Sequence, residues 1–310
     1  SKKQKINNNM EKELYKNRSF SACIAAAFNL FTANFKNIMH RMWLPMLLYT
    51  LSWAAQVTIL LNILPGALHP QTFATNPLNA LSSAFSIITL VFMIWFYVRL
   101  FGLLNHQTSD KNLTRFLKFI IGLVAISFVL GFILGIIMII CTTFAAMNHL
   151  PQETILGRIY LGIFFTVIVI VLLILPVYYF GMKYMIDDNT RIRKHFFSVI
   201  GCGYRHYGFI FATLMLSYLI TLPVLLICST PLIILGVSNG LSVLGQMRGD
   251  APTLPTYFPI ITYLAAVITG AATIIGNLWG TFVGYYMYGS IEAREAVRSK
   301  QKEIAETTEE

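Results

Sequence analysis

Charged residues are scarce in this chain. Only 12% of its 310 residues are Asp, Glu, Lys or Arg, whereas 56% are hydrophobic. Soluble domains carry about 25% charged residues. A soluble protein of this composition would have too little polar surface to cover its apolar side chains, whereas a lipid bilayer solvates such side chains directly. The shortage of charge therefore excludes an ordinary soluble domain and predicts a membrane protein.

Cysteines are also few. The chain has four, at Cys23, Cys141, Cys202 and Cys228. None belongs to a CxxC pair, which a disulfide framework or a structural zinc site usually contains. The six histidines include no pair at metal-ligand spacing on a predicted helix. We therefore expect small buried thiols, no bound metal and no cofactor.

Ionisable residues are missing from the interior of the long apolar stretches. No Asp, Glu or Lys lies near the middle of any of them, and no HExxH motif occurs. Charged groups at mid-membrane depth are costly, and they usually mark ion paths, proton relays or catalytic sites. We therefore do not expect a proton-coupled pump or an aspartyl or metal-dependent intramembrane protease, and the pattern favours a protein that is not an enzyme.

The chain is rich in long apolar stretches. A membrane-spanning helix needs about 20 residues. Six stretches reach that length, at residues 43–65, 79–104, 116–147, 157–186, 207–236 and 257–290. They predict an all-α polytopic membrane protein with six transmembrane helices.

The domain organisation follows from the even spacing of these stretches. We expect one six-helix membrane domain over residues 43–290. A polar cytoplasmic tail over 1–18 and an amphipathic segment over 19–42 precede it, and a charged cytoplasmic tail over 291–310 follows it.

The basic residues predict the orientation. Of 23 Lys and Arg, all except Arg158 and Arg248 lie before residue 43, between 99 and 118, between 183 and 205, or after 290. Positively charged loops stay in the cytoplasm, so both termini are predicted there. The net charge of +10 then belongs to residues that flank apolar spans. Anionic lipid headgroups at the cytoplasmic face are the expected partner, and nucleic acid is not, because no nucleic-acid-binding module accompanies the charge.

Two segments have the pattern of helices that lie flat on a membrane. Between residues 19 and 42, large apolar side chains recur every three or four positions, at Phe20, Ile24, Phe28, Phe31, Phe35, Ile38 and Met42. This spacing forms one apolar stripe on a helix, opposite a polar face. Residues 190–206 are shorter and more basic but similar in kind. We expect one or two amphipathic helices at the cytoplasmic interface.

Two rows of glycine at four-residue spacing predict close helix packing. One row lies in the sixth stretch, at Gly276, Gly280 and Gly284, and a shorter one lies in the third, at Gly131 and Gly135. The partner helix could belong to the same chain or to a second copy across a dimer seam.

Two prolines lie well inside apolar stretches. Pro176 is in the fourth and Pro223 in the fifth. Proline removes a backbone donor and kinks a helix. Two kinked neighbours could open a cavity, with Ser229, Thr230 and Asn277 as polar lining, or the kinks could be purely structural.

One motif matches a catalytic pattern. Residues 236–240 read Gly-Val-Ser-Asn-Gly, which is GxSxG. In hydrolases this motif forms a strand-to-helix elbow that presents the serine. Ser238, His149 and Asp250 are predicted on the same side of the membrane, so they form a candidate hydrolase set. The alternative is a glycine-rich helix end followed by a loop.

Three segments carry a resemblance to a known group of proteins. They are FNLFTANFKNIMHRMWLP, LPVYYFGMKYMIDDNTRIRKHF and GCGYRHYGFIFATL. In this layout the chain resembles six-helix bacterial inner-membrane proteins, including the membrane domain of some glycerophosphoryl diester phosphodiesterases. The resemblance implies a multi-pass protein of the bacterial cytoplasmic membrane. It implies no catalytic residues, because the phosphodiesterase domain of those proteins has no counterpart here.

Three functions remain open at this point. The first is a non-enzymatic scaffold, assembly factor or accessory subunit, with other membrane proteins or a second copy as partner. The second is a lipid-handling or transport protein with a cavity near the fourth to sixth helices. The third is a membrane-bound serine hydrolase. Neither a substrate nor a specific partner can be derived from the sequence.

Overall fold

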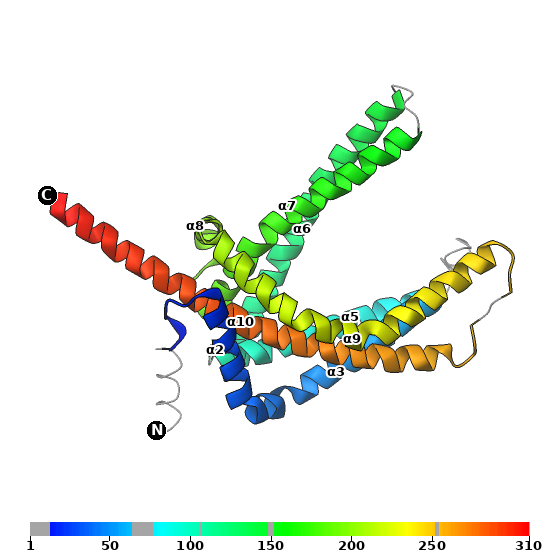
Figure 1. The fold of residues 1–310 in the computed structure, drawn as a ribbon, viewed down its shortest axis with the longest axis horizontal. Coiled ribbons are helices and arrows are strands. Elements are labelled where there is room, and N and C mark those ends of the chain that lie inside the picture. Colours follow the sequence, from blue (N-terminus) through cyan, green and yellow to red (C-terminus); the bar gives the residue numbers. More distant parts are fainter. Residues whose placement is uncertain (1–12, 64–76, 106, 148–151, 252–253, 310) are drawn as a thin grey trace. The chain divides into compact units, whose positions relative to one another are not determined.

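The computed structural model describes residues 13–63, 77–105, 107–147, 152–251 and 254–309 (Figure 1). Within these residues every regular element is an α-helix. The helices are α2 (Phe20–Ala33), α3 (Phe35–Ile63), α5 (Pro77–Leu104), α6 (Ser109–Met147), α7 (Gln152–Ile186), α8 (Ile192–Arg205), α9 (Tyr207–Met247) and α10 (Phe258–Glu309). Six of them are long and apolar enough to cross a membrane, and each corresponds to one predicted apolar stretch. The all-helical fold is thus confirmed, and the six helices indicate a multi-pass membrane protein.

The predicted membrane domain divides into two compact units. Unit 1 is formed by Ser1–Ser109 and Ala212–Glu310, and unit 2 by Asp110–Phe211. Unit 1 therefore contains α2, α3, α5, α10 and most of α9, and unit 2 contains α6, α7 and α8. The division places the two predicted glycine rows, and the two predicted kink prolines, in different units.

Unit 1 is organised around α3 and α10. The long helix α3 packs along both α5 and α10, and α2 packs against α10. The buried side chains between them are large and apolar, among them Phe96, Ile274 and Phe282, each at most 1% exposed. Many other large apolar side chains are exposed, such as Ile227 at 74%. A protein surrounded by lipid has this surface, because hydrocarbon is as apolar as the side chains themselves.

Polar side chains link neighbouring helices of unit 1. The Gln56 amide donates to the Ser86 hydroxyl at 2.8 Å and joins α3 to α5. The Thr269 hydroxyl donates to the carbonyl of Cys228 at 3.2 Å and joins α10 to α9. Each such bond between membrane helices contributes roughly 0.6 to 2 kcal/mol, so they fix helix position more than they add stability.

Unit 2 is a helical hairpin with a short third helix. The start of α6 lies beside the end of α7 (Figure 1). The ring centroids of Phe119 on α6 and Phe180 on α7 are 6.2 Å apart. Helix α8 packs against α7, and a Cβ added at Gly203 would lie 3.0 Å from the backbone of Pro176. The absence of a side chain at Gly203 therefore permits the α7–α8 contact.

The described part of the predicted polar tail over residues 1–18 packs on α10. Leu14 is 2% exposed, and the main chain of Arg18 donates to the buried Ser290 hydroxyl at 2.7 Å. The Arg294 guanidinium donates to the Arg18 carbonyl at 2.7 Å. A Cβ at Gly289 would collide with the Leu14 carbonyl. The contact was missed because its contributors are nearly 300 residues apart in sequence.

The predicted amphipathic helix over 19–42 is divided into two helices. Helix α2 begins after Ser19, whose hydroxyl accepts from the Ala22 N–H, and ends before Asn34. The Asn34 side chain donates to the Leu30 carbonyl at 3.1 Å, which caps α2. The residues from Phe35 to Met42 are the first turns of α3.

Helix α2 is held against α10 through a buried thiol. Cys23 is fully buried and its sulfur lies 3.7 Å from the Tyr286 carbonyl, to which it donates. Burial raises the pKa of the Cys23 thiol, with smaller opposing effects from Ser290, Arg18 and Arg294. This cysteine is therefore a packed side chain and not a nucleophile.

Two helices extend beyond the predicted apolar stretches. The fifth apolar helix does not end at residue 236 but continues to Met247, because glycine alone does not stop a helix whose other residues are apolar. It ends where Gly249 adopts a φ of +92° and the chain folds back onto Gly245. The predicted charged tail over 291–310 is helical to Glu309, as a continuation of α10.

Candidate functional site

The GxSxG motif lies inside a helix. Ser238 is part of α9, and its hydroxyl donates to the Ile234 carbonyl of the same helix at 2.9 Å. The strand-to-helix elbow that activates such a serine is therefore not formed around it. Asp250 lies in the turn after α9, and His149 lies outside the described residues. The alternative of a helix end and loop at this motif is wrong as well.

Asn239, next to Ser238, is the residue of the motif whose side chain bonds to another helix. Its side chain is 1% exposed and donates to the Leu61 carbonyl of α3 at 2.7 Å. In a continuing helix, that carbonyl would accept from the N–H four residues later. That residue is Pro65, which has no N–H. Asn239 thus satisfies a carbonyl that its own helix cannot, and the motif is structural at this position.

Two of the three polar residues predicted to line a cavity bond to their own helix. The Ser229 and Thr230 hydroxyls both donate to the Leu226 carbonyl, at 3.3 and 2.7 Å. At Asn277 the main-chain carbonyl accepts from the Thr281 hydroxyl at 2.8 Å, and the residue is not part of the lining of the groove described below. Because these hydroxyls serve their own backbone, they offer little to a ligand.

The two kink prolines lie in different environments. Pro176 is buried in unit 2 against α8. Pro223 is exposed on α9 in unit 1, where its neighbours Thr221 and Val224 line a groove. A groove therefore lies beside the proline-bearing helix α9. The residues that line this groove do not include the predicted Ser229, Thr230 and Asn277.

That groove, called here the acyl groove, lies in unit 1 between α2, α9 and α10 and has a volume of about 640 Å³. Its surface is almost entirely apolar. The side chains that define it include Phe28, Phe31, Val224, Cys228, Ala272 and Trp279. It follows that the acyl groove can receive an apolar ligand but cannot orient a polar one.

The shape of the acyl groove follows from small residues on α10 and large ones on α2. Ala271, Ala272 and Gly276 present little volume, and a Cβ added at Gly276 would meet only Leu225 methyl groups near 3.9 Å. Phe28 stacks edge-on with Trp279, with ring centroids 6.3 Å apart. Helix α2 thus covers one end of a channel that the small residues of α10 leave open.

Trp279 is held in place at that end. Its indole N–H donates to the Ser217 hydroxyl of α9 at 3.1 Å. The bond satisfies the one polar atom of the indole, so the ring presents only apolar surface to the groove. The position of Trp279 relative to α2 depends on how the two helices pack, so residue spacing in the sequence does not predict it.

Three glycines of the predicted rows have open space around them in the described chain. Added Cβ atoms at Gly131, Gly135 and Gly280 would meet no atom within 4 Å. Gly276 borders the acyl groove, and Gly284 is buried. The glycines that do allow close contact are others, such as Gly270, where an added Cβ would lie 3.0 Å from the Trp53 ring.

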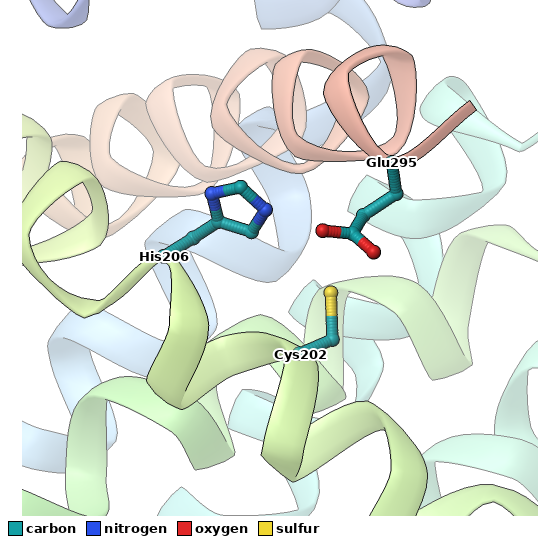
Figure 2. A group of neighbouring side chains, drawn as sticks. All are labelled: Cys202, His206 and Glu295. Atoms are coloured by element: carbon teal, nitrogen blue, oxygen red, sulfur yellow. The ribbon is translucent and has the colours of Figure 1, made fainter. Parts of the chain in front are cut away.

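Cys202 and His206 are one helical turn apart at the end of α8, and Figure 2 shows both side chains on the same side of that helix end. The Tyr179 hydroxyl of α7 lies 3.6 Å from the Cys202 sulfur. The third residue labelled in Figure 2, Glu295, belongs to α10 and so to unit 1. Unit 2 by itself offers two ligands here, whereas a structural zinc site takes four. We assign no metal to this pair.

Comparisons with models of known protein families, with curated proteins and with solved structures find no match to this chain.

Proposed function

We propose that this chain is a multi-pass, lipid-binding protein of the bacterial cytoplasmic membrane, and that the acyl groove holds a lipid hydrocarbon chain. The observation that carries the proposal is the groove itself: about 640 Å³, almost wholly apolar, and formed by two membrane-length helices together with α2. This volume lies within the range of roughly 300 to 1,000 Å³ typical of small-molecule sites.

The chemistry of the lining favours a hydrocarbon chain over a polar substrate. The Thr221 hydroxyl, on the groove wall, donates to the Ser217 and Tyr218 carbonyls. The Cys228 carbonyl accepts from Thr269. A polar ligand would lose its own hydrogen bonds to water and gain none in return, whereas an acyl chain loses nothing.

The proposed orientation rests on charge. Both termini lie in the cytoplasm, because the basic residues cluster beside them and in the loops on the same side. Helices α2 and α8 then lie at the cytoplasmic surface, where Phe28 and Phe31 of α2 bring the mouth of the acyl groove to the headgroup level.

Two other functions were open from the sequence. A scaffold or accessory subunit, with another membrane protein or a second copy as partner, remains a prediction. The hydrolase hypothesis loses its geometric support at Ser238, which donates to its own helix. The resemblance to six-helix bacterial inner-membrane proteins supports the proposed location and carries no activity.

Trp279 provides a direct test of the acyl groove. A variant with Phe at the other three tryptophans, Trp43, Trp53 and Trp95, would be reconstituted in phosphatidylcholine vesicles with brominated acyl chains. We expect strong quenching of Trp279 fluorescence, because bromine quenches on contact. Ala272→Phe, which fills the groove, should weaken the quenching.

The matched control is Leu264→Phe on the same helix. Leu264 is 58% exposed and does not line the groove, so this change should leave the quenching as it was. Equal quenching in Ala272→Phe and Leu264→Phe would mean that bulk lipid alone reaches Trp279, and the proposal would be wrong.

A further inference from the structure

Unit 2 contains a second groove of different character. It has a volume of about 1,090 Å³ and is bounded by the start of α6, the end of α7 and the start of α8. Four cationic side chains line it, Arg115, Lys118, Arg191 and Lys194. The carboxylate on its lining is that of Asp188. We call it the headgroup groove.

Arg115 is built into the wall of this groove. It is 8% exposed, and its guanidinium lies 4.6 Å from the centre of the Tyr184 ring. Its terminal nitrogens donate to the Asp188 carboxylate at 2.8 Å and to the Asp187 and Tyr184 carbonyls. Its Nε–H is buried and has no acceptor among the described residues. A buried donor of this kind is costly unless a ligand or water accepts from it.

The negative charge in the headgroup groove is already neutralised. Asp188 forms ion pairs with both Arg115 and Lys111. Lys118, Arg191 and Lys194 are exposed and form no ion pair within the described chain. Three cations are therefore free to contact an anion. A bound anion would relieve the electrostatic repulsion among these three side chains.

The start of α8 adds to this positive potential. Arg191 is its N-cap and provides no side-chain cap for the first turn. The turn before it is fixed by the Thr190 hydroxyl, which donates to the Asp187 carboxylate at 2.7 Å. The Arg191 N–H donates to His195 Nδ1 at 3.1 Å. A helix N-terminus without a side-chain cap from its N-cap residue still favours an anion, here beside the four basic side chains.

The wall of the headgroup groove that α6 forms beyond Lys118 is apolar. Ile121, Gly122 and Ala125 line it, and they belong to the part of α6 that is apolar enough to span a membrane. An added Cβ at Gly122 would meet no atom within 4 Å, so there is room along this wall. A free phosphate ion would need only the cations, whereas a phospholipid uses both parts of the lining.

We propose that the headgroup groove binds one anionic phospholipid. Its phosphate lies among Lys118, Arg191 and Lys194, within reach of the Arg115 Nε–H, and one acyl chain runs along α6 past Gly122 and Ala125. The site is independent of the acyl groove, since every residue that lines it belongs to unit 2.

Native mass spectrometry of the full chain in detergent tests this site. Phosphatidylglycerol and phosphatidylcholine with identical acyl chains would be titrated separately. We expect phosphatidylglycerol to bind about a hundredfold more tightly, since each of the three basic residues contributes about 1 kcal/mol towards anionic lipid and about 1.4 kcal/mol corresponds to a factor of ten. The triple variant Lys118→Gln, Arg191→Gln, Lys194→Gln should lose about that factor.

The control carries the same change of charge elsewhere. Arg298, Lys300 and Lys302 are exposed near the end of α10, and their replacement by Gln should leave phosphatidylglycerol binding unchanged. Equal loss in both triple variants, or equal affinity for the two lipids, would overturn the proposal. Displacement of phosphatidylglycerol by millimolar inorganic phosphate would also overturn it, by pointing to a free phosphate site.

A second variant keeps the basic residues intact. Gly122→Phe fills the apolar wall, and it should weaken phosphatidylglycerol binding while Trp279 quenching in unit 1 stays the same. Unchanged phosphatidylglycerol binding in a folded Gly122→Phe protein would mean that no acyl chain lies along α6. Phosphatidylglycerol binding thus tests the headgroup groove, and Trp279 quenching separately tests the acyl groove.

Discussion

At the scale of single residues, two neighbours on α9 have different roles. The Ser238 hydroxyl donates to its own helix, and the Asn239 amide reaches the last turn of α3. Only Asn239 is buried among other helices, at 1% exposure. The GxSxG pattern made Ser238 a candidate nucleophile and drew no attention to Asn239. The signal for Asn239 in the sequence is Pro65. Because proline has no N–H, the Leu61 carbonyl four residues earlier needs a hydrogen-bond donor from elsewhere.

Replacing these neighbours should separate their roles. Asn239→Leu leaves the Leu61 carbonyl without its donor and should lower the free energy of unfolding by about 1 kcal/mol. Ser238→Ala should change it by less than about 0.5 kcal/mol, as surface substitutions do. Thermal unfolding in detergent, followed by circular dichroism, measures both. A larger loss for Ser238→Ala than for Asn239→Leu would contradict the assignment.

At the scale of elements, glycine spacing was a poor guide to contact. Gly280 belongs to a regular row, yet an added Cβ there would meet nothing within 4 Å. Gly289 belongs to no predicted row, yet the main chain at Leu14 lies directly against it. A glycine is required where another backbone approaches, and only the path of the second segment decides where that is.

Two alanine substitutions on α10 test this difference. Replacing glycine by alanine favours the helix by roughly 1 kcal/mol at either position. Gly289→Ala should nevertheless release residues 13–18, because overpacking against a backbone costs about 1 to 3 kcal/mol. Faster tryptic cleavage at Lys16 and Arg18 would report the release, and Gly280→Ala should leave the cleavage rate unchanged. If the two variants were cleaved equally, the packing of Leu14 on α10 would be wrong.

At the scale of the whole molecule, the distribution of charge is the feature that predicts orientation. Basic residues gather beside alternate loops and both termini, and the same residues form the headgroup groove at the start of α6 and α8. If the positive-inside rule holds, the headgroup groove faces the cytoplasmic leaflet, where anionic lipids are enriched in many membranes.

Cysteine labelling tests the orientation. In a background with the four native cysteines changed to Ser, Asp250→Cys and Ser299→Cys each introduce one exposed thiol. A membrane-impermeant maleimide added to intact cells should label the first and not the second. Ser299→Cys should become labelled only after permeabilisation. The reverse pattern would invert the proposed topology.

The sequence by itself determined that the chain is helical and that six of its helices have membrane length. Hydropathy and helix length are properties of consecutive residues, so they can be summed along the chain without knowledge of the fold. The same reasoning identified Pro223 and Gly276 as notable, and both lie at or beside the acyl groove. It missed the continuation of α9 and α10, because apolar count does not mark where a helix stops.

Only the tertiary structure decided which residues meet. The acyl groove requires Phe28 of α2 to lie over Trp279 of α10, and the headgroup groove requires Arg115 of α6 to lie beside Asp188 before α8. These contacts join residues far apart in sequence, and no local pattern encodes them. Each arises because a small residue leaves room or a buried polar group needs a partner, and both conditions depend on the neighbouring helix.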